Sequence, residues 1–379
     1  MDVWFSNPAQ PESEAVRVSF PIPEADFEGV IGQLQAIGIG DAAAQDCKVN
    51  KIDNPLYWCL TSLVGQQVNV DELDYLAKRL GKLEKEFNYP AMADKLGLKN
   101  IREFINLTLI ADYTTIIRRF DDMGVWEKAG RDHFLIANGP CSTRQLRMVD
   151  GIDVMKDLIA TGTGTVTQYG VIFDNGYELP DLYRGGPFPE HHERPEHHER
   201  PGVLYGTIAQ EPYPDMMENP TFLYFPMSDL RLARAMKRGG LEHERGLTLV
   251  LNEEFCPLPV LDAMGDRWTV DADGGALRDI NAMCAAIQPL TDVQRLKLGA
   301  VIDMAKPLDM NQIRRLAENL DQFVIHPKLP RKERVEYIGE TPLADLMGPP
   351  GPQEPSRDAG SHAVERGKER HQTAKTEAR

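Results

Sequence analysis

The chain has 379 residues, of which 42% are hydrophobic, and 42 Lys and Arg side chains against 58 Asp and Glu give a formal net charge of −16. This charge argues against direct nucleic-acid binding, which needs a basic face, and no apolar run is long enough to cross a bilayer. No basic segment followed by an apolar run opens the chain, so we expect no secretory signal. The five cysteines form no C-x-x-C pair and no metal-ligand spacing, which indicates reduced thiols in the cytoplasm.

The first predicted elements are a short strand and a helix. Residues 16–20 alternate apolar and polar side chains, which predicts a strand that Pro21 ends. Acidic residues that suit a helix N-terminus follow. Apolar side chains at helical spacing then predict a helix from Phe27 through Leu34, and Gly38 ends it.

The same half contains three further predicted elements. Residues 44–52 form a strand-like run. A helix opened by acidic residues is predicted from apolar side chains at helical spacing, which are Leu73, Leu76, Leu80 and Leu83. Another helix is predicted over residues 101–108.

A second copy of this pattern begins some two hundred residues later. Residues 222–225 predict a strand, Pro226 breaks it, and Ser228 is a candidate N-cap of the helix that follows. Leu230, Leu232, Ala233 and Met236 are its expected apolar face. A strand over 247–251 and helices around Ile280 and Ile313 follow in the same order.

We therefore predict a duplicated module, at roughly 16–110 and 221–325. The predicted fold class is α+β, with duplicated small α/β modules in an elongated multi-domain chain. The predicted domains are the first module (1–110), a middle segment (111–220), the second module (221–330) and a mostly disordered tail (331–379). The tail is predicted because few large apolar residues follow Met347.

The middle segment has its own pattern. Residues 165–173 predict one strand, and the turn residues 174–176 make it a hairpin with 177–179. The hexapeptide PEHHER then occurs twice in tandem, at 189–194 and 195–200, as expected of an insertion in a surface loop.

The sequence contains only incomplete motifs for catalytic or metal-binding sites. Neighbouring histidines in the PEHHER repeat point in opposite directions and lack a distant ligand. The GTGT run near 162 lacks the Gly-Lys-Ser/Thr ending of a phosphate loop. Cys141 lies near His133 and Asp132 in sequence but in no activated-thiol motif. We expect no enzyme activity, cofactor or metal, although an enzyme built around the middle segment stays an alternative.

Negative charge is concentrated upstream. Residues 1–110 carry 10 basic and 16 acidic side chains, and residues 111–220 carry 10 and 18. Residues 221–330 carry 13 and 15, so the second module is nearly neutral. Carboxylates held on a rigid scaffold can imitate the phosphates of a duplex and attract a protein with a basic DNA groove. The candidate carboxylates are Asp71, Glu72, Asp74, Glu84, Glu86, Asp112, Asp121, Asp122, Glu127 and Asp132.

Residues 16–135 resemble the ArdA-type antirestriction proteins of mobile genetic elements. The resemblance lies in the Phe-Pro-Ile opening, in VNVDELDYLAKRL (68–80), in IREFINLT (101–108) and in WEKAGRD (126–132). Gly130-Arg131-Asp132 is similar to the family's Tyr-Gly-Arg-Asp end motif, with Ala129 in place of Tyr. The whole chain also resembles longer ArdA-type proteins, and this likeness includes the segments YGVIFDNGYEL (169–179) and LAENLDQF (316–323).

The resemblance implies an acidic, elongated homodimer of small α/β modules. Such a protein occupies the DNA-binding cleft of type I restriction-modification enzymes and protects the incoming DNA of plasmids and conjugative transposons. The alternative is a non-catalytic protein-binding or scaffold protein of a conjugative element.

Overall fold

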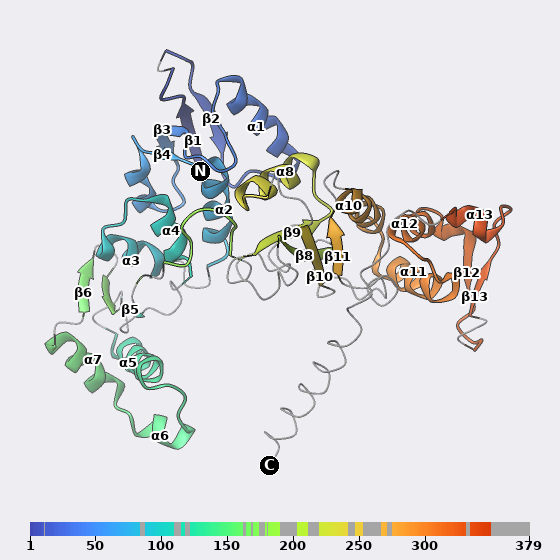
Figure 1. The fold of residues 1–379 in the computed structure, drawn as a ribbon. Helices are drawn as coiled ribbons and strands as arrows, with labels where there is room; N and C mark the ends of the chain where they lie inside the picture. The colour runs from blue at the N-terminus through green and yellow to red at the C-terminus, as the bar shows by residue number, and fades with distance from the viewer. Residues whose placement is uncertain are drawn as a thin grey trace. The chain divides into compact units, whose positions relative to one another are not determined.

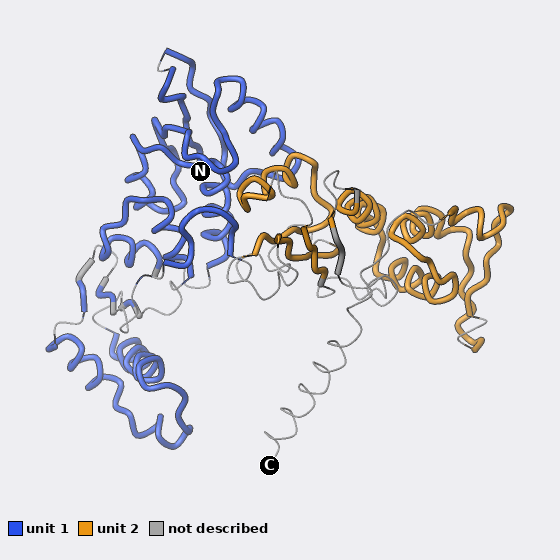
Figure 2. The backbone as a smooth tube through the Cα atoms, viewed as in Figure 1, with its two compact units in different colours: residues 1–192 blue, residues 193–379 orange. Residues whose placement is uncertain are grey.

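The protein forms two compact units, residues 1–192 and 193–379 (Figures 1 and 2). A computed structural model describes residues 1–10, 12–83, 88–109, 115–117, 122–161, 164–167, 170–173, 179, 181–189, 203–210, 220–241, 247–252, 267–270, 275–330 and 334–349. All strand pairs within these ranges are antiparallel. The fold class is α+β, as the sequence predicts.

Unit 1 begins with a four-stranded sheet in the order β2-β1-β3-β4. Its strands are β1 (Asp2–Ser6), β2 (Val16–Ser19), β3 (Cys47–Asp53) and β4 (Gln67–Val68). Val3, Phe5 and Val18 are buried on one face, as expected for an alternating strand. The short helix η1 (Glu24–Asp26) and α1 (Phe27–Ala36) follow β2, and Gly38 has a positive φ of 76° just past the helix end.

Three helices complete this first module. They are α2 (Val70–Leu80), α3 (Asn88–Leu96) and α4 (Ile101–Leu107), and η2 (Trp58–Leu63) packs against α3. Residues 181–189, which we call the strap, return to α2 and α4 after a long excursion of the chain. The strap therefore belongs to the first module, although it lies far downstream in sequence.

The excursion between α4 and the strap forms a second layer of unit 1. It contains β5 (Thr115–Ile117), α5 (Met123–Asn138), α6 (Thr143–Met148), α7 (Gly151–Ala160), β6 (Gly164–Thr167) and β7 (Gly170–Phe173). The strands form a sheet in the order β5-β7-β6, which packs against α3. The prediction of a single strand over 165–173 is wrong, because β6 and β7 are two strands of one hairpin.

Unit 2 has a four-stranded sheet in the order β9-β8-β10-β11. Its strands are β8 (Leu204–Ala209), β9 (Thr221–Phe225), β10 (Leu247–Asn252) and β11 (Arg267–Val270). The helices α8 (Asp229–Arg238) and α10 (Gly275–Ile287) occupy the places of α1 and α2 in the chain order. The two sheets thus share strand order and direction, as two copies of one module would. Their strands β1 and β8 lie before the predicted module starts at residues 16 and 221, so β8 belongs to the second sheet and not to the predicted middle segment.

The remainder of unit 2 is helical apart from one hairpin. Its elements are α11 (Asp292–Ala305), α12 (Met310–Glu318), η7 (Leu320–Gln322), β12 (Phe323–Ile325), β13 (Val335–Tyr337) and α13 (Leu343–Met347). Arg315 of α12 donates to the Met347 carbonyl at 2.9 Å, and Gln312 donates to the Gly348 carbonyl at 2.9 Å. This segment after α12 is held much as the strap is held by α4.

The buried face of α8 differs from the sequence prediction, and two other predicted segments extend beyond the described residues. Ser228 caps α8 as predicted, but the residues that α8 buries most deeply are Arg234 and Arg238, not its aliphatic side chains. Long Arg stems can cover apolar surface, so the helix contributes to packing through them. The tail was predicted to begin at residue 331, but residues 334–349 contain β13 and α13. The rest of the predicted tail beyond 349, and residues 190–200 of the PEHHER repeat, lie outside the described residues.

Candidate functional site

Three of the candidate carboxylates open α2, and the structure buries them. Asn69 caps the helix by accepting hydrogen bonds from the backbone N–H groups of Asp71 and Glu72, at 3.0 and 3.1 Å. Its side-chain amide donates to the carbonyls of Asp41, Ala42 and Ala44. The 41–44 loop therefore lies over the start of α2. The expectation that Asp71, Glu72 and Asp74 are part of an exposed charge array is wrong, since all three are buried.

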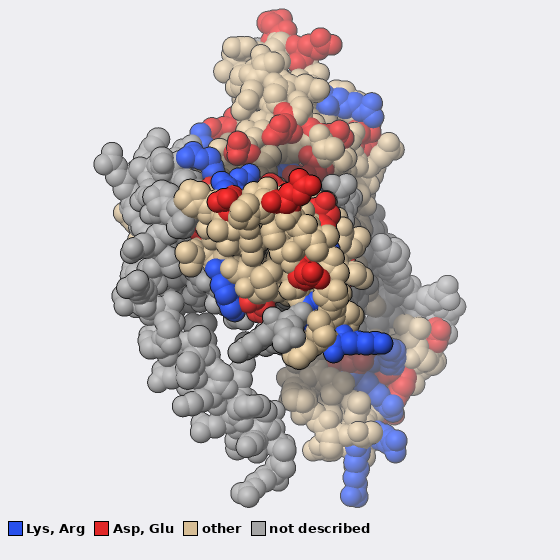
Figure 3. Space-filling model, turned by 90° about the vertical axis from the view of Figure 1, so that its right-hand side faces the viewer, with Lys and Arg blue, Asp and Glu red and all other residues tan. Residues whose placement is uncertain are grey.

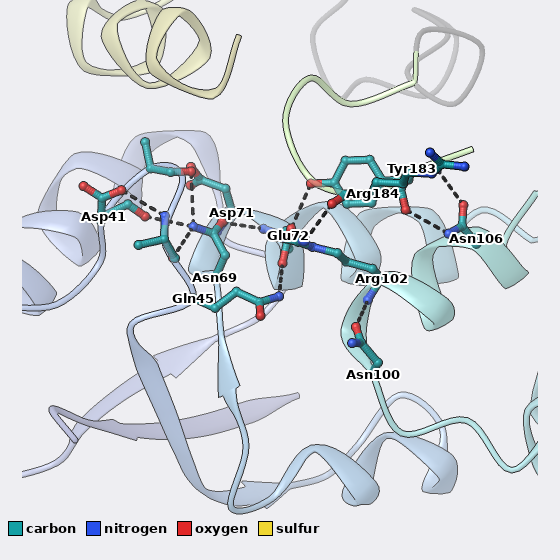
Figure 4. Close-up of polar contacts among 12 residues, drawn as sticks. Asp41, Gln45, Asn69, Asp71, Glu72, Asn100, Arg102, Asn106, Tyr183 and Arg184 are labelled. Atoms are coloured by element: carbon teal, nitrogen blue, oxygen red, sulfur yellow. Dashed lines mark hydrogen bonds and ion pairs between the residues drawn. The ribbon is translucent and has the colours of Figure 1, made fainter. Parts of the chain in front are cut away.

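Glu72 has no exposed surface and connects three segments that are distant in sequence (Figure 4). Its Oε1 accepts from Nε of Arg102 at 2.9 Å and from the Tyr183 hydroxyl at 3.0 Å. Its Oε2 accepts from Nε2 of Gln45 at 3.0 Å. A buried carboxylate needs such partners, because an unpaired charge in the core is strongly unfavourable. Glu72 is therefore a structural anchor of unit 1.

The strap is held on both of its edges. Asn106 donates to the Tyr183 carbonyl and accepts from the Tyr183 N–H, each at 2.9 Å, and Arg102 donates to the Arg184 carbonyl at 2.6 Å (Figure 4). The ring of Phe188 stacks on Tyr75 with 4.2 Å between ring centroids. These contacts place the strap across α2 and α4, and they explain why the IREFINLT segment carries an Asn in its interior.

Asp74 fixes the turn that follows β2. Its Oδ1 accepts from the Ile22 N–H at 2.7 Å, and its Oδ2 pairs with Lys78 at 2.7 Å. In unit 2 the same place is taken by Asn281, whose side chain accepts from the Met227 N–H at 2.8 Å and donates to the Met227 carbonyl at 2.7 Å. The anchored residue follows a cis proline in both units, Pro21 in the first and Pro226 in the second. Both modules therefore use an Asx side chain from the helix after the sheet to hold this turn.

The candidates on α5 lie at the surface but are partly neutralised. Asp122 is the exposed N-cap of the helix. Glu127 pairs with Arg131 at 2.5 Å and accepts from a backbone N–H at the start of α7 at 3.1 Å. Asp132 pairs with Lys128 at 2.6 Å. The remaining candidates, Glu84, Glu86, Asp112 and Asp121, lie outside the described residues.

The Gly-Arg-Asp segment of α5 holds two helices together. A Cβ on Gly130 would lie 1.9 Å from the Gly151 carbonyl oxygen, and a Cβ on Gly151 would lie 2.0 Å from the Glu127 carbonyl oxygen. Arg131 also donates to the Val149 carbonyl at 3.2 Å. Glycine is required at both positions because the backbones of α5 and α7 are in direct contact there. This motif thus has a packing role within the protein.

A different group of carboxylates remains exposed, and we call it the acidic edge. It consists of Glu12, Glu14, Glu24, Asp26 and Glu28, which lie in the β1–β2 loop, in η1 and at the start of α1. Residues 8–46 contain seven carboxylates and one cation, Arg17, and this cation pairs with Asp2 at 2.8 Å. At the β1–β2 loop, which lies at the top of unit 1 in Figures 1 and 3, Figure 3 shows Asp and Glu side chains without Lys or Arg.

The acidic edge was not among the sequence candidates. Glu24, Asp26 and Glu28 could be assigned from the sequence only to a helix start. A local charge count over 8–46 would have found the surface, because one basic residue among seven acidic ones is a strong local imbalance.

The two ends of the acidic edge are separated by β2, a strand of four residues that spans roughly 13 Å at about 3.3 Å per residue.

The thiol of Cys59 is a poor nucleophile at physiological pH. Burial raises the pKa of Cys59 to about 12, so its thiol stays protonated at physiological pH. Asp132, which the sequence placed near Cys141 and His133, is engaged by Lys128. Among the described side chains, no three His, Cys, Asp or Glu residues are arranged to hold a metal ion. The helices in the described ranges also include none with the length and apolarity of a membrane span.

Comparison with protein-family models, with curated proteins and with solved structures finds no match for this chain.

Proposed function

We propose that unit 1 is an antirestriction module that mimics DNA and occupies the DNA-binding cleft of a type I restriction-modification enzyme. In this proposal the protein is not a catalyst and needs no cofactor. The observation that carries it is the acidic edge, in which five exposed carboxylates face solvent with only one cation, already paired, in the same segment. The resemblance of residues 16–135 to ArdA-type proteins supports the same function.

The proposed mechanism is electrostatic and distributed. A basic cleft that releases counterions on binding DNA gains the same attraction from a rigid row of carboxylates. The part of the acidic edge in η1 and α1 is anchored to the core through Phe27, Ile31 and the Asp74 contact to Ile22. Each exposed charge contributes only a few tenths to about 1 kcal/mol. Single substitutions should therefore change inhibition little, whereas neutralising the whole edge should weaken it at least about tenfold.

The test is inhibition of DNA cleavage by a purified type I enzyme, measured over a salt series. A variant with Glu12, Glu14, Glu24, Asp26 and Glu28 changed to Gln or Asn should have an inhibition constant at least about tenfold higher, since five charges at about 0.3 kcal/mol each sum to roughly 1.5 kcal/mol. Inhibition by the wild-type protein should weaken steeply with salt and be relieved by duplex DNA.

A matched control removes the same number of charges elsewhere. Its five substitutions neutralise the exposed carboxylates Glu318, Asp321, Glu336, Glu340 and Asp345 of unit 2. This control should inhibit as well as the wild type. Equal loss in both variants would show that only net charge matters, and a wild-type protein without salt-sensitive inhibition would favour the scaffold alternative.

A further inference from the structure

The short helix η2 in unit 1 presents an apolar face to solvent. A 3-10 helix has three residues per turn, so side chains three positions apart lie on the same face. Leu60 and Leu63 form its inner face and have no exposed surface. Trp58, Thr61 and Val64 form its outer face, on which Trp58 is 68% exposed and Val64 is 44% exposed. A large aromatic side chain exposed to this degree is typical of an interaction surface.

The exposed apolar side chains of the first module gather around this outer face. Among the described residues of 1–109, the large apolar side chains that are exposed are Leu56, Trp58, Val64 and Leu96, and we call these four the η2 face. Leu96 ends α3, which packs against η2. Gln66, just past η2, donates to the Lys99 carbonyl, just past α3, at 2.8 Å. The ends of the two helices therefore lie side by side.

The backbone that carries Trp58 is fixed by local hydrogen bonds. The Thr61 hydroxyl donates to the Trp58 carbonyl at 2.8 Å. Gln66 donates to the Ser62 carbonyl at 2.7 Å. These bonds occupy carbonyls that a short helix would otherwise leave without a partner. An aromatic side chain on a fixed backbone loses little freedom on binding, which makes it an effective anchor.

The η2 segment carries no charge, unlike its counterpart in unit 2. Residues 54–66, which connect β3 to β4, contain no charged side chain, although charged residues make up 26% of the chain. Residues 253–266, which connect β10 to β11, contain four carboxylates. An uncharged apolar surface offers nothing to phosphate groups, so its matching partner is an apolar recess of a protein.

The η2 face and part of the acidic edge begin at the same end of the sheet. β2 ends at Ser19 and β3 ends at Asp53, and both residues pair with Asp2 of β1. The two strand ends are thus two strand spacings apart, roughly 10 Å. The η1 helix follows the first end, and the η2 face follows the second. A standard protein interface covers about 800 Å² of each partner, which is large enough to include both.

We propose that the η2 face inserts into an apolar recess beside the basic DNA-binding cleft of the restriction-modification enzyme. This inference rests on the proposed function, because it assigns a second surface to the same complex. The five charges of the acidic edge account for only about a tenfold change in binding. Exposed charges mainly accelerate association, whereas buried aromatic and aliphatic side chains slow dissociation. The acidic edge attracts the enzyme, and the η2 face retains it.

The test measures association and dissociation rates of the full chain on an immobilised, purified type I enzyme over a salt series. Trp58→Ala should raise the dissociation rate at least about tenfold and leave the association rate and its salt dependence unchanged. Met148→Ala is the control, because Met148 is an apolar residue of unit 1 that is 81% exposed and lies outside the η2 face. The variant without the acidic edge should instead associate more slowly.

Val64→Glu distinguishes an apolar contact from one that depends on charge alone. The substitution adds a carboxylate, which a basic cleft attracts, so a purely electrostatic complex would become tighter. An apolar contact predicts faster dissociation instead. Far-UV circular dichroism verifies that the variants are folded, which is expected since all the substituted side chains are exposed.

The outcomes separate this inference from the proposed function. A wild-type chain that does not bind the enzyme overturns both. A wild-type chain that binds, with Trp58→Ala dissociating at the wild-type rate or Val64→Glu binding more tightly, overturns the η2 contact alone. Binding of the chain to phosphatidylcholine–phosphatidylglycerol vesicles that Trp58→Ala abolishes would assign the face to a membrane and also overturn it.

Discussion

Replacing Glu72 by Ala tests whether this carboxylate anchors the strap. The substitution leaves the buried Tyr183 hydroxyl without its acceptor and removes the ion-pair partner of Arg102. Breaking a buried pair by removing one partner costs about 3–5 kcal/mol. The Arg102 side chain is 33% exposed, so water can solvate part of it, and we expect the lower end, about 3 kcal/mol. Glu72→Gln keeps the shape and an acceptor oxygen and should cost about 1 kcal/mol.

The assay must report on unit 1 alone, because a chain with two compact units need not unfold in one step. Native-state hydrogen exchange of the Tyr183 amide meets this need, since that amide is bonded to Asn106 in the strap contact. Its opening free energy should fall by about 3 kcal/mol in Glu72→Ala and by no more than about 0.5 kcal/mol in the surface control Glu14→Ala. Equal exchange of Tyr183 in Glu72→Ala and the wild type would refute the anchoring role.

Three further predictions concern packing, the repeated turn and the thiols. Gly130→Ala should destabilise unit 1 by about 1–3 kcal/mol or more, because the new Cβ would clash with the Gly151 backbone. The control is Gly32→Ala in α1, where a Cβ meets nothing within 4 Å; it should stabilise unit 1 by about 0.5–1 kcal/mol, as measured by thermal unfolding. Asn281→Ala should cost unit 2 about 1–3 kcal/mol, seen as faster exchange of the amide it accepts from, and unchanged exchange there would contradict the anchor. Cys59 should be alkylated roughly a thousand times more slowly than an ordinary thiol at pH 8, by peptide mass spectrometry, because its pKa is raised to about 12. Because the pKa of Cys59 is higher in the folded state, the unfolded state loses the thiol proton first, and the free energy of unfolding falls as pH rises above 9. Equal alkylation rates of Cys59 and free cysteine would contradict the burial of this thiol.

Elements defined by neighbouring residues could be predicted from the sequence. The β2 strand, the end of α1 at Gly38 and the Ser228 cap of α8 all depend on side chains within a few positions, and the structure has each of them. The duplication could be predicted for the same reason, because each copy repeats a local order of strand, proline and helix. These are short-range effects of backbone geometry and capping, and they require no knowledge of the fold.

Burial and partners could not be predicted in the same way. The α2 carboxylates looked like surface charges because their neighbours in sequence are polar, but Glu72 meets Arg102 and Tyr183, which are 30 and 111 positions away. The place of the strap, the contact between Gly130 and Gly151, and the choice of the acidic edge over α2 as the exposed charge were likewise decided by tertiary structure. A carboxylate near a helix start satisfies the local rules whether it faces water or the core, and only the long-range packing of the chain determines which of the two environments surrounds it.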